Sequence, residues 1–133
     1  MRYFRYKKLV RDKIVESMKN NGQKPLGVKI LDDKMFMQEL IKKLIEESIE
    51  MLQVNDIDEL KEELSDVVEI INYLKKTLKL SDKRLAELLK LKKDKNGGFD
   101  KRLFLDRVGI PEENNRIGYY LNNQDRYPEV HGN

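Results

Sequence analysis

The chain has 133 residues, of which 39 % are hydrophobic and 38 % charged, and its formal net charge is +3 at pH 7. It contains no cysteine and a single histidine, His131, which excludes disulfides and thiolate metal sites and argues against histidine-centred catalysis. The length suits one domain, and because no apolar run is long enough to cross a bilayer, we expect a cytoplasmic protein with no membrane partner.

Capping side chains and glycines divide the chain into helices, which predicts an all-α fold. Helices are expected over 9–21, from Asp32 or Asp33 to about Val54, from the Asn55-Asp56 break to about Lys79, and over 82–95 between Ser81 and Gly97-Gly98. An irregular connector is expected over 23–31. The two long helices are joined by few residues, so they should pack as an antiparallel hairpin. After Pro111 a polar tail is expected.

Charge is distributed unevenly along the chain. Residues 1–34 carry ten basic and four acidic side chains, residues 35–70 carry three basic and eleven acidic, and residues 71–107 carry twelve basic and five acidic. An acidic block between two basic blocks suits a cation held at its centre and an anion bound around it. The alternative interpretation is that the three blocks are solvated helix faces.

Four acids lie on or beside the apolar faces of the two long helices. At about 100° per residue, Glu47 falls inside the apolar stripe of the first long helix, and Glu50 falls at the edge of that stripe. Glu63 falls inside the stripe of the second long helix and Asp66 at its edge, whereas Glu69 points away. Each helix therefore has one acid on its inner, apolar face and a neighbouring acid at the edge of that face.

Acids in these positions predict a bound cation. Unpaired carboxylates are costly to bury and repel one another, so a positive charge must compensate them. Only oxygen donors are available, which indicates a hard ion such as Mg²⁺ or Mn²⁺. Iron-carboxylate bundles carry a Glu-x-x-His pair on two helices, and this chain has no such pair. The alternative is chance, because a single Glu-x-x-Glu pair arises in any acidic helix.

Three segments resemble a known family when they are taken together. Residues 47–50 read Glu-Ser-Ile-Glu and residues 63–66 read Glu-Leu-Ser-Asp, with twelve residues between them. Residues 6–14 read Tyr-Lys-Lys-Leu-Val-Arg-Asp-Lys-Ile, and residues 96–102 read Asn-Gly-Gly-Phe-Asp-Lys-Arg. These segments resemble the all-α NTP pyrophosphatase superfamily, the MazG-like group, and its branch of predicted house-cleaning pyrophosphatases. The resemblance implies a MazG-like helical bundle over 1–109 that forms a homo-oligomer, and leaves 110–133 as a tail of unknown role.

The resemblance also implies an activity. Members of the superfamily hydrolyse a nucleoside triphosphate between its α and β phosphates, which gives the monophosphate and pyrophosphate and requires Mg²⁺. The implied metal ligands are Glu47, Glu50, Glu63 and Asp66. Glu46 and Glu47 would be the catalytic acids, with Glu46 either a further ligand or the group that orients the attacking water; alternatively, Glu46 is an exposed helix acid.

Basic residues near both ends of the implied domain are expected to bind the triphosphate. These are Lys8, Arg11, Lys13, Lys101 and Arg102. For the three residues of the amino-terminal segment, the alternative is an exposed basic helix face. The nucleotide itself is not predicted, although the branch indicates a non-standard one.

Three rival functions remain open. Phosphoribosyl-ATP pyrophosphohydrolase carries the same acids and differs in its substrate. A nucleic-acid-binding module would use the lysines of 83–95, although the acidic block would repel a phosphate backbone. A catalytically idle relative would sense nucleotides or hold a partner without hydrolysis.

Overall fold

The computed structural model describes residues 1–132, and all of its regular secondary structure in that range is helical. The helices are α1 (Ile14–Asn20), α2 (Asp33–Gln53), α3 (Ile57–Thr77), α4 (Asp82–Asn96) and α5 (Ile117–Leu121). The predicted all-α class is therefore confirmed. The chain divides into two compact units, Met1–Leu91 and Lys92–Asn133. The predicted domain limit at residue 109 lies within the second unit and stays a prediction.

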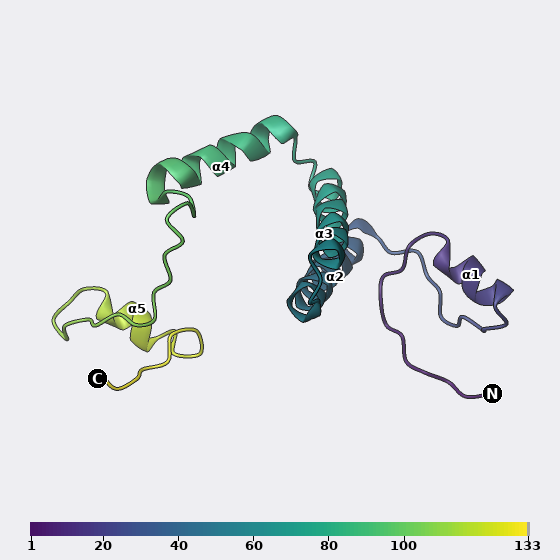
Figure 1. Ribbon diagram of the computed structural model, residues 1–133, viewed down its shortest axis with the longest axis horizontal. Coiled ribbons are helices and arrows are strands. Elements are labelled where there is room, and N and C mark those ends of the chain that lie inside the picture. The colour runs from purple at the N-terminus through teal and green to yellow at the C-terminus, as the bar shows by residue number, and fades with distance from the viewer. Residues whose placement is uncertain (133) are drawn as a thin grey trace. The chain divides into compact units, whose positions relative to one another are not determined.

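Helices α2 and α3 lie side by side and form the hairpin of the first unit (Figure 1). Asp32 caps α2 as predicted, because its Oδ1 accepts a hydrogen bond of 2.8 Å from the N–H of Met35. Asp56 precedes α3, but its side chain makes no capping hydrogen bond. The rings of Phe36 and Tyr73 meet edge to face with centroids 6.5 Å apart. This contact joins the start of α2 to the end of α3, so the hairpin is antiparallel as predicted.

The interior of the hairpin is small and contains an acid. Leu40 of α2 and Ile70 of α3 are the buried hydrophobic side chains among residues 1–132, with 3 % and 8 % of their surface exposed. Glu47 of α2 is also only 8 % exposed. A charged side chain in such a position costs free energy unless a partner compensates it.

Helix α1 is shorter than predicted at its amino end. It was expected from Leu9 but begins at Ile14, and residues 1–10 have no regular structure. Lys8 offers no side-chain acceptor that could cap a helix beginning at Leu9, so the first N–H groups would lack a partner there. At the carboxyl end the prediction is confirmed, because Gly22 has a φ of +76° and closes the helix. Residues 1–13, which precede α1, are called the arm below.

Helix α4 follows its predicted limits closely. The Oγ of Ser81 accepts a hydrogen bond of 3.1 Å from the N–H of Arg84, and this caps the first turn. Gly97, with a φ of +80°, follows the last helical residue. No helix within residues 1–132 is long and apolar enough to span a membrane.

Helix α5 lies in the second unit and was not predicted. Its Tyr119 and Tyr120 pack with Tyr127, and the three ring centroids lie 5.3–5.9 Å apart. The guanidinium of Arg116 stands 5.8 Å from the centroid of the Tyr119 ring. A helix of five residues is too short to show a periodic apolar face, so no pattern in the sequence predicts it, and packing among the tyrosines stabilises it.

Candidate metal centre

Three carboxylates from both helices of the hairpin converge. Glu47 and Glu50 come from α2 and Glu63 comes from α3, and one oxygen of each lies within 4.8 Å of the others. Glu47 and Glu50 are three residues apart, so they share a face of α2. The inward direction predicted for Glu47 is confirmed by its burial. The structure thus brings together three of the four acids that the sequence proposed as ligands.

Two of these carboxylates carry a buried oxygen without a hydrogen-bond partner, namely Oε2 of Glu47 and Oε2 of Glu63. Buried polar atoms in proteins nearly always have a partner, and the lack of one costs about 1–3 kcal/mol. Burial and the nearby carboxylates of Glu63 and Glu50 raise the pKa of Glu47 to about 7. A cation between these carboxylates would compensate their charge and satisfy both oxygens.

The donor set fits a hard divalent cation. All three converging side chains are carboxylates, which suit Mg²⁺ and Mn²⁺ and leave no soft ligand for other metals. The three come from a rigid helix pair rather than from a loop, so their mutual positions are fixed by helix packing. The part of the chain that the structure describes therefore contains a cluster able to hold such an ion.

The other two acids of the predicted site are bound to basic side chains. Oδ1 of Asp66 accepts a hydrogen bond of 2.9 Å from Nη2 of Arg11. Oε1 of Glu46 accepts one of 2.7 Å from Nζ of Lys8, and Nζ of Lys43 lies 3.7 Å from its Oε2. These lysines hold the pKa of Glu46 below its ordinary value. The ligand role of Asp66 and the catalytic role of Glu46 stay predictions.

Two of the five predicted phosphate-binding residues lie against the acidic helices. Lys8 and Arg11 extend from the arm and bind acids of α2 and α3, respectively. Lys13 is the N-cap residue of α1. Lys101 and Arg102 belong to the second unit, so their assignment stays a prediction.

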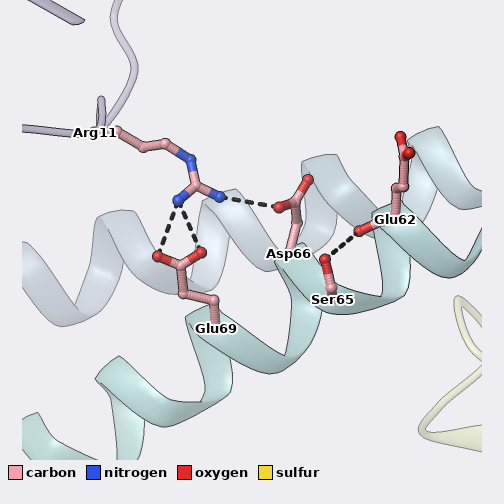
Figure 2. Close-up of polar contacts among 5 residues, drawn as sticks. All are labelled: Arg11, Glu62, Ser65, Asp66 and Glu69. Carbon is pink, nitrogen blue, oxygen red and sulfur yellow. Dashed lines mark hydrogen bonds and ion pairs between the residues drawn. The ribbon is translucent and has the colours of Figure 1, made fainter. Parts of the chain in front are cut away.

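Sequence reasoning missed Glu69. Both of its carboxylate oxygens accept hydrogen bonds from Nη1 of Arg11, at 2.9 and 2.8 Å (Figure 2). The helical wheel correctly directs this side chain away from the core, and 44 % of it is exposed. The wheel does not show that the arm passes over that face. Arg11 and Glu69 are 58 residues apart in the chain, so no local pattern pairs them.

An open hollow adjoins the carboxylates where α2 turns into α3. Its volume is about 570 Å³, within the range of small-molecule sites. The lining residues are Glu50, Gln53, Val54, Asn55, Asp56, Glu59 and Glu63. Because four of these seven are acids, an anionic substrate would be repelled until a cation is bound.

Comparisons of this chain with protein-family models, with curated proteins and with solved structures give no match. The resemblance to the MazG-like group, carried by residues 6–14, 47–66 and 96–102, stays a prediction.

Proposed function

We propose that this chain is a Mg²⁺-dependent nucleoside triphosphate pyrophosphohydrolase that acts on non-standard nucleotides. The observation that carries the proposal is the convergence of Glu47, Glu50 and Glu63, with two buried oxygens that lack a partner. The cluster supports the metal that such a reaction needs. The reaction itself, hydrolysis between the α and β phosphates, comes from the MazG-like resemblance.

Each residue of the proposed site would have a separate role in this reaction. Glu47, Glu50 and Glu63 would hold the cation, with Asp66 as a fourth ligand. Bound Mg²⁺ would neutralise the phosphate oxygens and orient a water for in-line attack. Glu46, kept ionised by Lys8, would accept a hydrogen bond from the attacking water. The arm adds positive charge at the rim of an acidic site, where phosphate oxygens need donors.

The test is a pyrophosphate-release assay over ordinary, deoxy and modified nucleoside triphosphates and phosphoribosyl-ATP, with Mg²⁺ or with EDTA. We expect equal amounts of monophosphate and pyrophosphate, only with Mg²⁺, and the highest kcat/KM on a modified triphosphate. The exposed acid Glu62, on the same helix as Glu63, provides the control, since Glu62→Gln should keep full activity.

Other outcomes of the assay would select a different function. Consumption of phosphoribosyl-ATP alone would identify a phosphoribosyl-ATP pyrophosphohydrolase instead. Tight nucleotide binding with Mg²⁺ but without pyrophosphate release would indicate a sensor. Salt-dependent binding to DNA or RNA that persists in Glu47→Gln would favour a nucleic-acid-binding module.

We propose further that the protein is a homodimer in which each hairpin covers the other. Apolar side chains on the two helices are exposed in stripes at helical spacing; they are Ile41, Ile45, Ile49 and Leu52 of α2 and Leu64, Val68 and Ile71 of α3. Such stripes normally pack against another element. A second copy offers an identical stripe, so a two-fold axis satisfies both hairpins at once.

If the homodimer forms through these stripes, a charged residue in one of them should weaken the association of the two copies. Ile45→Glu places a charge in the middle of the stripe and should weaken the dimer by about 2 kcal/mol or more, roughly thirtyfold in Kd. Sedimentation equilibrium measures the change. Ile30→Glu is the matched control, since Ile30 is fully exposed in the connector outside the hairpin. A wild-type chain that sediments as a monomer at high micromolar concentration would refute the dimer.

A further inference from the structure

Arg11 is bound by two carboxylates through different nitrogens of its guanidinium. Nη1 donates to both oxygens of Glu69, and Nη2 donates to Oδ1 of Asp66 (Figure 2). Both acids lie on α3, three residues apart, and so present one face to the arm. Because the two carboxylates bind separate nitrogens, loss of the hydrogen bond to Asp66 leaves both hydrogen bonds to Glu69 in place.

The two acids differ in their relation to the carboxylate cluster. Asp66 lies one turn from Glu63, whose buried Oε2 lacks a partner. Its negative charge also contributes to the raised pKa of Glu47. Glu69 lies a further turn along α3 from Glu63, and its carboxylate is hydrogen-bonded to Arg11. Asp66 is therefore near both the carboxylate cluster and the arm, whereas Glu69 is hydrogen-bonded to Arg11 of the arm.

The bond between Arg11 and Asp66 is weak enough to exchange. The side chains of Arg11, Asp66 and Glu69 are 60 %, 38 % and 44 % exposed. An exposed ion pair of this kind favours the paired state by a factor of about five at most. A divalent cation held by several carboxylates is a far stronger competitor for one of them.

We propose that Glu69 is a positioning residue that keeps Arg11 at the rim of the carboxylate site, and that Asp66 is an exchangeable partner that passes from Arg11 to a divalent cation. This inference rests on the proposed function, because it requires a cation at Glu47, Glu50 and Glu63. After the exchange, Nη1 stays on Glu69 and Nη2 becomes available to donate to a phosphate oxygen. Arg11 thus binds a nucleotide more readily when the cation is in place.

The first test is a double-mutant cycle read by Mn²⁺ binding alone, without nucleotide. Arg11→Gln removes the competitor for Asp66, so Mn²⁺ should bind about two- to fivefold more tightly. The same substitution in an Asp66→Asn background should tighten Mn²⁺ binding by a clearly smaller factor, because it then removes only the longer-range charge of Arg11 near Glu47. Lys8→Gln is the matched control: it removes one positive charge of the arm from Glu46, and its effect should be equal in both backgrounds.

The second test measures how accessible the Arg11 side chain is to trypsin. The readout is the rate of cleavage after this residue. In the wild-type chain, Mn²⁺ should change this rate less than about twofold, because Glu69 still holds the guanidinium. In Glu69→Gln, Mn²⁺ withdraws Asp66 and leaves no carboxylate partner, so cleavage after Arg11 should accelerate by about threefold or more. Cleavage after Lys13, in the same arm, is the internal reference, and circular dichroism confirms that the variants fold.

The outcomes separate this inference from the proposed function. If Mn²⁺ does not bind the wild-type chain, the carboxylate site and the exchange both fail. If Mn²⁺ binds but Arg11→Gln tightens it equally in both backgrounds, only the exchange at Asp66 is refuted. If Glu69→Gln gives no Mn²⁺-dependent cleavage after Arg11, Glu69 does not position this residue.

Discussion

Glu47→Gln is expected to abolish Mg²⁺-dependent pyrophosphate release and, without metal, to stabilise the fold at pH 8. Glu47 is buried beside two other acids, and its Oε2 has no donor. Glutamine keeps the shape of the side chain, removes the charge and offers an N–H to the neighbouring carboxylates. We expect kcat/KM to fall at least about a hundredfold, because several kcal/mol of charge stabilisation depends on the cation.

The same substitution should raise the free energy of unfolding of the metal-free chain by about 3 kcal/mol at pH 8, where Glu47 is ionised in the fold. Urea unfolding in EDTA, followed by circular dichroism, measures this change. Glu62→Gln, on the exposed surface of α3, should alter neither activity nor stability. A Glu47→Gln chain that is more stable yet fully active would agree with a free-energy cost of burying the Glu47 carboxylate. It would refute the assignment of Glu47 to a metal site. A less stable chain would show that the carboxylate is compensated within the fold.

Gain of stability together with loss of activity is the signature expected of a functional carboxylate rather than a structural one. An acid that serves the fold alone has a donor or a cation beside it, as Glu39 has Lys42. Glu47 and Glu63 each retain an oxygen without one, in a core with few apolar side chains to offset the cost. A fold keeps such an arrangement where function requires it.

Much of the helical structure could be predicted from local signals. Asp32 and Ser81 cap their helices through hydrogen bonds that a sequence pattern reveals, and Gly97 ends α4 because its φ is positive. The burial of Glu47 follows from the period of α2 alone. These features depend on residues a few positions apart, which is the range over which a sequence pattern constrains the backbone.

The contacts of the arm could not be predicted in this way. Arg11 meets Asp66 and Glu69, which are 55 and 58 residues away, and the arm that carries Arg11 has no periodicity that fixes its path. The sequence indicated that Arg11 is functional but assigned it to phosphate, whereas in the structure it binds carboxylates. Helix α5 was missed for a related reason, since ring packing among tyrosines sustains it rather than an apolar stripe.

The metal-free chain is expected to lose stability as the pH rises through the window between Glu47's unfolded and folded pKa values. Burial beside other carboxylates raises the pKa of Glu47 in the folded chain to about 7 from the ordinary value of 4.5. Between these values the folded chain holds a proton that the unfolded chain has released, so raising the pH favours unfolding. The loss should reach about 3 kcal/mol and level off above the folded pKa. Urea unfolding in EDTA at half-unit pH steps measures it.

Mg²⁺ should remove this decline, because the cation binds the ionised form of Glu47 and so leaves the folded chain no proton to lose across the window. The apparent Mg²⁺ affinity should rise by up to about tenfold per pH unit below the folded pKa and become constant above it. Glu46 contributes the opposite trend at lower pH, since Lys8 lowers its pKa and the stability it adds is lost only on acidification. Glu47→Gln should abolish both the metal-free decline and the pH dependence of Mg²⁺ binding. If the decline persists in that variant, another carboxylate of the cluster carries the buried proton.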